Sequence, residues 1–416
     1  MQLAGLTRRG LQYIPARGMR SSVRRSRPLL LIATALTLAL AVAACGSRAA
    51  SLRARATGSV GASAQASSSV TIRAAHLIQG TTGWALSDDA LSLTSNGGQS
   101  WTGITPPGVS AGAIRGVYFL DTQHGWVVSS SASDPDQLEV SVTTDGGTSW
   151  STSALGSPDP SFGNSDLAYV DFADSQHGWV VAMIASSAGI LPQGVLFQTT
   201  DDGATWQKLQ MPVGGPVEFV NATTGWLADG NQGEAAPRFY ITSDGGQSWT
   251  PETVTPPTGF TQDQATYTIP SFTTSADVVL AAFDNGSSAS AGFYQTNDAG
   301  TTWQQKATVP AGKPEGDVSP STAVVNPISW MAVSPYGTSI MAVTQNGASQ
   351  SSMSPTGLPA NSGISDVSFT GTGSTAAGWV VSNTNQCTGK KTGCTEVTAL
   401  FGTTDGGTHW AQLSVP

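Results

Sequence analysis

Two carboxylates and two arginines are the residues of this chain best placed to do chemistry. Asp171 and Glu218 occupy the same place in neighbouring copies of a sequence repeat. Glycoside hydrolysis uses such paired carboxylates, so both are catalytic candidates, although the same residues would also suit a merely polar, hydrated channel. Arg73 and Arg115 share another place in the repeat. We expect them to neutralise the two acids or to bind a carboxylate of a ligand.

The repeat that carries these residues consists of an apolar stretch, a polar turn and a Gly-Trp pair followed by more apolar residues. It reads HLIQGTTGWAL (76–86), VYFLDTQHGWVV (117–128), YVDFADSQHGWVV (169–181), VEFVNATTGWLA (217–228) and VSFTGTGSTAAGWVV (367–381). Short apolar runs bounded by turn residues predict paired β-strands. Alignment on Gly-Trp brings six residues to one recurring position: His76, Tyr118, Asp171, Glu218, Ser271 and Ser368. His76 and Tyr118 are therefore possible ligand-binding residues.

A second motif of eight residues follows each Gly-Trp repeat and ends in tryptophan. Its six copies are Thr94–Trp101, Thr143–Trp150, Thr199–Trp206, Thr242–Trp249, Thr296–Trp303 and Thr403–Trp410, with a decayed copy at Thr344–Gly347. Including the decayed copy, the spacing from start to start is 43 to 59 residues. Regular spacing near 50 residues predicts a propeller or a solenoid.

The motif has the composition of a tight turn between two strands. We expect its third residue to accept hydrogen bonds from backbone N–H groups, its glycine to adopt a positive φ and its tryptophan to begin the returning strand. The third residues are Asn96, Asp145, Asp201, Asp244, Asp298 and Asp405. The tryptophans are Trp101, Trp150, Trp206, Trp249, Trp303 and Trp410.

These turns resemble the Asp-box, or BNR repeat, of sialidase-like and sortilin-like propellers. Together with the Gly-Trp strands they predict an all-β fold over residues 71–416, a seven-bladed β-propeller of four-stranded antiparallel blades with Asp-box turns. All twelve tryptophans fall within the two repeats. No tryptophan is therefore left over to stack on a sugar.

The first 70 residues differ from the rest in composition. Residues 1–45 resemble a bacterial lipoprotein signal peptide, with arginines before an apolar run that ends at Cys45. The alternatives are an ordinary signal peptide or an uncleaved anchor. We expect an exported protein whose Cys45 carries a lipid and holds it at the outer face of the cell membrane. Residues 46–70 are rich in Ser, Ala and Arg and predict a flexible tether.

Charge and cysteine content narrow the range of partners. Residues 71–416 hold all 27 acidic residues and only 8 of the 18 basic ones, a net charge of −19, which argues against nucleic acid. Cys387 and Cys394 form an even pair in an exported chain, and we expect a disulfide rather than a metal site. No pattern predicts a bound metal or a cofactor. Several acidic residues fall in the loops of variable length, and a protein or glycan ligand is expected on the face that these loops form.

The whole pattern is similar to the photosystem II stability/assembly factor family. That resemblance implies a lipid-anchored propeller that binds or scaffolds membrane complexes through an arginine-rich patch, and residues 71–416 contain Arg73, Arg115 and Arg238. The function expected is a non-catalytic binding, scaffold or assembly-factor-like module. The alternative is a sialidase-like or other exo-glycosidase acting on extracellular glycans; if the protein is an enzyme, we expect a glycoside hydrolase.

Overall fold

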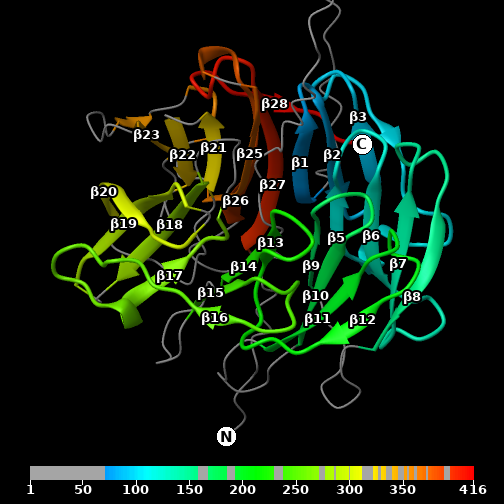
Figure 1. Ribbon diagram of the computed structural model, residues 1–416. Helices are drawn as coiled ribbons and strands as arrows, with labels where there is room; N and C mark the ends of the chain where they lie inside the picture. Colours follow the sequence, from blue (N-terminus) through cyan, green and yellow to red (C-terminus); the bar gives the residue numbers. More distant parts are fainter. Residues whose placement is uncertain are drawn as a thin grey trace, which may run out of the picture. The chain divides into compact units, whose positions relative to one another are not determined.

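The computed structural model describes most of the chain beyond residue 70. The described residues are 71–157, 167–184, 193–228, 238–270, 277–284, 287–298, 300–311, 322–326, 329–333, 340–344, 351–353, 356–359, 363–371, 373–387 and 394–416. They all belong to one compact unit, shown in Figure 1. Within these residues there are strands, turns and three short 3-10 helices, and no α-helix.

The strands form seven four-stranded sheets, numbered here along the chain. Sheets 1 and 2 contain β1 (Ile72–Gln79), β2 (Thr82–Ser87), β3 (Leu91–Thr94) and β4 (Thr102–Gly103), then β5 (Ile114–Phe119), β6 (Gly125–Ser130), β7 (Leu138–Thr143) and β8 (Ser151–Gly156). Sheets 3 and 4 contain β9 (Ala168–Phe172), β10 (Gly178–Ile184), β11 (Gln193–Thr199) and β12 (Gln207–Leu209), then β13 (Val217–Phe219), β14 (Gly225–Ala228), β15 (Phe239–Thr242) and β16 (Thr250–Pro251).

The remaining three sheets follow the same order. Sheet 5 contains β17 (Ala265–Tyr267), β18 (Asp277–Asp284), β19 (Ala289–Thr296) and β20 (Gln304–Ala311). Sheets 6 and 7 contain β21 (Thr322–Asn326), β22 (Ser329–Val333), β23 (Ile340–Thr344) and β24 (Ser351–Met353), then β25 (Gly363–Thr370), β26 (Ala377–Cys387), β27 (Cys394–Thr403) and β28 (Ala411–Leu413). The 3-10 helices are η1 (Ala111–Ala113), η2 (Gln262–Gln264) and η3 (Gly373–Thr375).

Every described sheet is an antiparallel meander of four consecutive strands. In sheet 3, for example, Trp179 pairs with Asp171 on one side and with Gln198 on the other. The all-β fold and the four-stranded antiparallel units predicted from the sequence are confirmed.

Neighbouring sheets pack through buried apolar side chains. Separate clusters join sheets 1 and 2, 2 and 3, 3 and 4, and 4 and 5. Two stacked aromatic pairs lie at these junctions: Trp126 of β6 on Phe172 of β9, with ring centroids 3.6 Å apart, and Trp179 of β10 on Phe219 of β13, at 3.5 Å. The Gly-Trp tryptophan thus packs on the phenylalanine of the next sheet.

The first and last sheets also pack on each other, as the blue and red strands of Figure 1 show. Ile72 and Leu77 of β1 share an apolar cluster with Trp379 of β26 and Leu400 of β27. The Leu77 N–H donates to Ser368 Oγ at 3.1 Å, and Trp101 Nε1 donates to the Ser414 carbonyl at 2.8 Å. Contacts therefore join segments about 300 residues apart in sequence.

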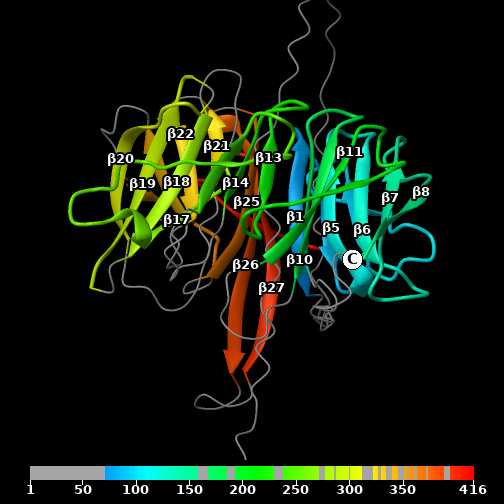
Figure 2. The same ribbon diagram turned by 60° about the horizontal axis from the view of Figure 1, so that its bottom comes forward.

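Sheet 7 contains the longest strand pair among the described elements. β26 and β27 pair through ten positions, from Gly378 opposite Thr403 to Cys387 opposite Cys394. In Figure 2 this hairpin projects past the ends of the other sheets.

Candidate functional site

Each motif of eight residues forms a turn between the third and fourth strands of its sheet, and we call it the repeated turn. In the copy at 143–150, the Thr143 hydroxyl donates to Asp145 Oδ1 and accepts the Gly147 N–H, each at 2.8 Å. Asp145 Oδ1 also accepts the Ser149 N–H at 2.8 Å, and Oδ2 accepts the Ser149 hydroxyl. The same three bonds to the threonine and to Oδ1 recur at Asn96, Asp201, Asp244, Asp298 and Asp405.

These bonds favour the ionised carboxylate. Hydrogen bonds from the hydroxyl and backbone of Ser149 hold the pKa of Asp145 below its ordinary value. The pKa values of Asp201, Asp244 and Asp298 are lowered by the equivalent Thr205, Ser248 and Thr302. For Asp405, the backbone and then the side chain of His409 lower the pKa. The turn aspartates are thus structural acceptors.

The fourth residue of the repeated turn connects it to two other parts of the fold. Its N–H donates to a carbonyl in the turn between the first and second strands of the same sheet, as in Gly146 to Gln123 and Gly245 to Thr223. Its carbonyl accepts the indole N–H of the Gly-Trp tryptophan of the preceding sheet, at 2.9 Å from Trp179 to Gly245. The two sequence repeats are therefore physically joined at this residue.

The recurring position of the Gly-Trp repeat serves to tie one sheet to the next. Asp171 is 1% exposed, and its Oδ2 accepts the N–H of Phe219 in sheet 4 at 2.5 Å. The Tyr118 hydroxyl donates to the carbonyl of Phe172 in sheet 3 at 3.1 Å, and Ser368 Oγ accepts the N–H of Leu77 in sheet 1. In each case the side chain reaches the residue that follows the recurring position in the neighbouring sheet.

Glu218 and His76 also occupy this position in the described residues. Glu218 is buried in β13, opposite Trp226, and β13 contacts β9, so the two candidate carboxylates come from adjacent strands as predicted. His76 lies opposite Trp84 in the β1–β2 pair, with ring centroids 6.4 Å apart. Ser271 lies outside the described residues.

The two candidate arginines gather at the 3-10 helix η1, between sheets 1 and 2. Arg73 donates from Nη1 to the Ala111 carbonyl and from Nη2 to the Ile114 carbonyl, both at 2.8 Å. Burial lowers the pKa of Arg73. Arg115 donates from Nη1 to the Gly112 carbonyl at 2.8 Å, while its buried Nε has no hydrogen-bond partner. Arg73 therefore bridges two sheets, whereas Arg115 bonds to the backbone of η1, three residues before it.

The cysteine predictions fall partly outside the structure. Cys45 and the rest of residues 1–70 lie outside the described residues. Cys387 and Cys394 are directly opposite each other in the β26–β27 ladder, which is the backbone arrangement that a disulfide between neighbouring strands needs. In the described segments, no three His, Cys, Asp or Glu side chains are grouped so as to hold a metal ion. The short helices there are also not membrane spans.

One residue that sequence reasoning missed is Asp202, the fourth residue of the repeated turn in sheet 3. It has φ +61°, and no other non-glycine residue in the described part of the chain has a positive φ. Its Oδ1 is buried without a hydrogen-bond partner. The signal was present in the sequence, because TTDDGATW has Asp where four other copies have Gly.

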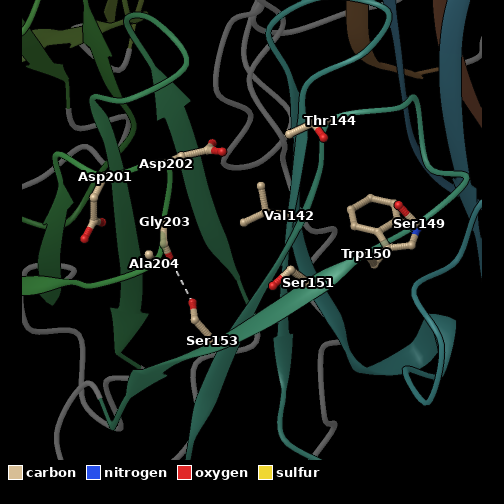
Figure 3. A pocket seen from close by; sticks show the side chains of 10 residues that line it. All are labelled: Val142, Thr144, Ser149, Trp150, Ser151, Ser153, Asp201, Asp202, Gly203 and Ala204. Atoms are coloured by element: carbon tan, nitrogen blue, oxygen red, sulfur yellow. Dashed lines mark hydrogen bonds between the residues drawn. The ribbon is translucent and has the colours of Figure 1, made fainter.

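Asp202 lines a cavity of about 290 Å³ between the repeated turns of sheets 2 and 3 (Figure 3). Trp150, Ser151 and Ser153 line it from sheet 2. The Ser153 hydroxyl donates to the Gly203 carbonyl at 2.6 Å and links the two walls. The cavity lies on the side of the repeated turns, not on that of the variable loops where the sequence predicted binding.

The sequence of this chain was compared with models of known protein families. Residues 109–268 match the family model for photosynthesis system II assembly factor YCF48. The middle of this chain is therefore similar to that family, and we call residues 109–268 the Ycf48-like segment. The Ycf48-like segment runs from the loop before η1 to the loop after β17, and it contains Arg115, Asp171, Asp202 and Glu218.

A relative that carries the name of this family model is the photosystem II assembly lipoprotein Ycf48 of Synechococcus sp. (strain CC9902). It is 29% identical over 133 residues, which are 32% of this chain and 34% of the relative. The match therefore spans about a third of that protein's length.

Several solved structures are also similar to this chain. YCF48 bound to D1 peptide aligns with 72% of this chain and 82% of its own, at 16% identity and a TM-score of 0.42. YCF48 from Cyanidioschyzon merolae aligns with 72% of this chain and 84% of its own, at 16% identity and a TM-score of 0.44. The GH74 xyloglucanase from Xanthomonas campestris aligns with 76% of this chain and 47% of its own, at 15% identity and a TM-score of 0.45.

Proposed function

We propose that this chain is a non-catalytic, assembly-factor-like β-propeller that binds protein partners. The observation that carries the proposal is the match of residues 109–268 to the Ycf48 assembly factor family. The seven four-stranded sheets, and the hydrogen bonds that recur in six repeated turns, support a seven-bladed propeller with Asp-box turns.

The recurring position supports a scaffold rather than an enzyme. In three sheets its side chain is bonded to the backbone of the next sheet, and Asp171 is one of these. A carboxylate that accepts a buried N–H is held in place as part of the scaffold, and moving a proton onto it would weaken that bond. The alternative is an exo-glycosidase, which rests on the adjacency of Asp171 and Glu218 in β9 and β13.

The partner is proposed to bind on the side of the variable loops, close to η1. Arg115 offers guanidinium donors there, and Arg73 adds a second positive charge that is held in place by two carbonyls. A peptide carboxylate is a ligand that fits a guanidinium of this kind. The strongly acidic remainder of residues 71–416 would disfavour an acidic partner elsewhere.

The proposal includes export and lipid anchoring. Residues 1–45 are proposed as a lipoprotein signal peptide, 46–70 as a tether and 71–416 as the propeller, with the lipid on Cys45 at the outer face of the cell membrane. The name of the Synechococcus relative, a lipoprotein, supports this. Metabolic labelling with a palmitate analogue should mark the wild-type chain and should not mark Cys45→Ser.

A disulfide between Cys387 and Cys394 is proposed to close the β26–β27 hairpin. The register of the two strands supports it. Peptide mass mapping without reduction should recover the two cysteines in one linked species. Alkylation of both thiols in the unreduced, unfolded chain would contradict it.

Protein binding can be tested in intact membranes. Chemical crosslinking followed by purification of the full chain should recover a defined membrane-protein complex. Arg115→Ala should reduce the recovery, and Lys306→Ala, which removes the same charge in β20, should leave it unchanged. Equal recovery with all three proteins would contradict a ligand site at Arg115.

Catalysis is tested separately with a panel of fluorogenic glycosides and sialosides. The proposal expects no turnover. Turnover that Asp171→Asn or Glu218→Gln abolishes would establish the exo-glycosidase alternative instead.

A further inference from the structure

The cavity between the repeated turns of sheets 2 and 3 is lined by side chains that take no part in the hydrogen bonds from the recurring position to the next sheet. Asp202 and the aromatic side chain of Trp150 line opposite walls, and Val142 lies between them (Figure 3). Ser151 and Thr144 also line the cavity and add hydroxyl groups to it. A volume of about 290 Å³ is close to the smallest pockets that hold small ligands.

Asp202 is kept at a position where a glycine would be less strained. The equivalent residues Gly97, Gly146, Gly245 and Gly406 have φ between +68° and +77°, which costs glycine nothing. An aspartate at φ +61° is strained, and strain of this kind collects at binding sites. Its Oδ1 is also buried without a hydrogen-bond partner, which is a second cost of keeping an aspartate here.

The local charge favours a cation. Burial raises the pKa of Asp202, and the nearby His124 and the indole of Trp126 oppose this rise. The His124 ring is itself 2.9 Å from the Asp121 carboxylate. Asp201 adds a further negative charge beside the cavity. The net charge of −19 over residues 71–416 attracts cationic partners from a distance.

We propose that this cavity binds the cationic side chain, arginine or lysine, of a protein partner. The guanidinium or ammonium group would bond to Asp202, and the aliphatic stem and cation would lie against Trp150. A metal ion such as Ca²⁺ takes six to eight oxygen ligands, whereas one carboxylate and one aromatic ring suit an organic cation. This site is distinct from the ligand site proposed at Arg115, so either can fail without the other.

The experiment uses the full chain in detergent, labelled with 5-fluorotryptophan. Its Trp150 signal is assigned in ¹⁹F NMR through Trp150→Phe. The probe is Nα-acetyl-arginine amide, with the uncharged isostere Nα-acetyl-citrulline amide as the matched ligand control. Saturable movement of the Trp150 signal with the arginine probe, and none with citrulline, is the expected result.

Asp202→Gly is the decisive variant because it restores the residue that the other turns use. We expect it to fold and to raise Tm by roughly 1–3 °C, since it removes a strained backbone. It should weaken binding of the arginine probe by about tenfold or more. Asp136→Asn, which removes the same charge at an exposed loop residue between β6 and β7, should bind like the wild type.

Three results would overturn the proposal. One is equal binding of the arginine probe by the wild type and Asp202→Gly. Another is an equal response of Trp150 to arginine and citrulline. The third is a Trp150 signal that moves with Ca²⁺ alone and not with the arginine probe, which would make the cavity a metal site.

Discussion

At the scale of single residues, side chains that are able to do chemistry are used here to hold sheets together. Asp171, Tyr118 and Ser368 differ in chemistry, yet each bonds to the backbone of the next sheet at the same place. A backbone N–H or carbonyl at a sheet junction needs a partner, and any side chain of suitable reach and polarity can provide it. The residue type at the recurring position can therefore differ between sheets while the hydrogen bond to the next sheet is kept.

Removing the hydrogen bond between Asp171 and the Phe219 N–H should destabilise the fold. Asp171→Ala leaves the buried Phe219 N–H without its acceptor, and we expect the free energy of unfolding to fall by roughly 1–3 kcal/mol. Asp171→Asn keeps an acceptor oxygen and should lose less. Urea unfolding followed by fluorescence measures both. An equal loss for Asn and Ala would show that the charge, not the acceptor, matters.

The aspartates of the repeated turns should make the protein sensitive to acid. Their lowered pKa values in the folded state mean that their stabilising effect is present above the ordinary aspartate pKa, about 4, and is lost as pH falls below it. Asp202 and Glu252, whose pKa values burial raises, act in the opposite sense but are fewer.

A single turn aspartate gives the test. Asp244→Asn keeps the acceptor Oδ1, as Asn96 does naturally, but cannot be protonated. The difference in Tm between pH 6 and pH 3 should therefore be smaller in Asp244→Asn than in the wild type. Asp136→Asn serves as the control and should leave this difference unchanged. The same difference in Tm in all three proteins would show that ionised Asp244 does not contribute to the loss of stability in acid.

At the scale of elements, the Gly-Trp pair and the phenylalanine of the preceding strand form one unit. The Phe172 ring of β9 lies over Gly178 of β10, and Phe119, Phe219 and Phe369 lie over Gly125, Gly225 and Gly378 in the same way. The glycine leaves room for the ring, and the tryptophan beside it stacks on the phenylalanine of the next sheet. The spacing of the repeat thus reflects packing both within a sheet and between sheets.

A methyl group at this glycine should be costly. In Gly178→Ala the new Cβ would collide with the Phe172 ring, and we expect a loss of about 1–3 kcal/mol in unfolding free energy. Gly103→Ala in β4 is the matched control, because a Cβ there meets no atom within 4 Å. Thermal and urea unfolding of the two variants measure the effect. Equal stability would mean that the ring moves aside without cost.

At the scale of the whole described unit, sheets 1 and 7 meet without a chain connection between them. Their junction depends on non-covalent contacts alone, with Trp379 in the apolar cluster and its ring close to Gly83. The other junctions are supported by the chain that links consecutive sheets. We therefore expect this junction to open before the junctions that the chain links.

Trp379→Ala should open that junction locally. Truncating a buried tryptophan costs about 3–5 kcal/mol, and here the loss falls on an interface with no covalent link. Hydrogen exchange should accelerate in peptides from β1 and β25, including the Leu77 amide that bonds to Ser368. Trp179→Ala is the control at a chain-linked junction and should accelerate exchange less. Equal acceleration at both junctions would contradict the idea.

The sequence by itself determined the local structure, because strands and turns are encoded by neighbouring residues. The period of about 50 residues, the Gly-Trp strands and the turn from Thr143 to Trp150 predicted four-stranded antiparallel units, since spacing and glycine placement leave few other backbones. Only the tertiary structure determined which hydrogen-bond partner each polar side chain has. From the sequence Asp171 was a catalytic candidate or part of a polar channel, and Asp202 was unnoticed. The sequence does not state which backbone N–H from the next sheet reaches a carboxylate. That partner lies 48 residues away for Asp171, and for Asp202 Oδ1 none is present.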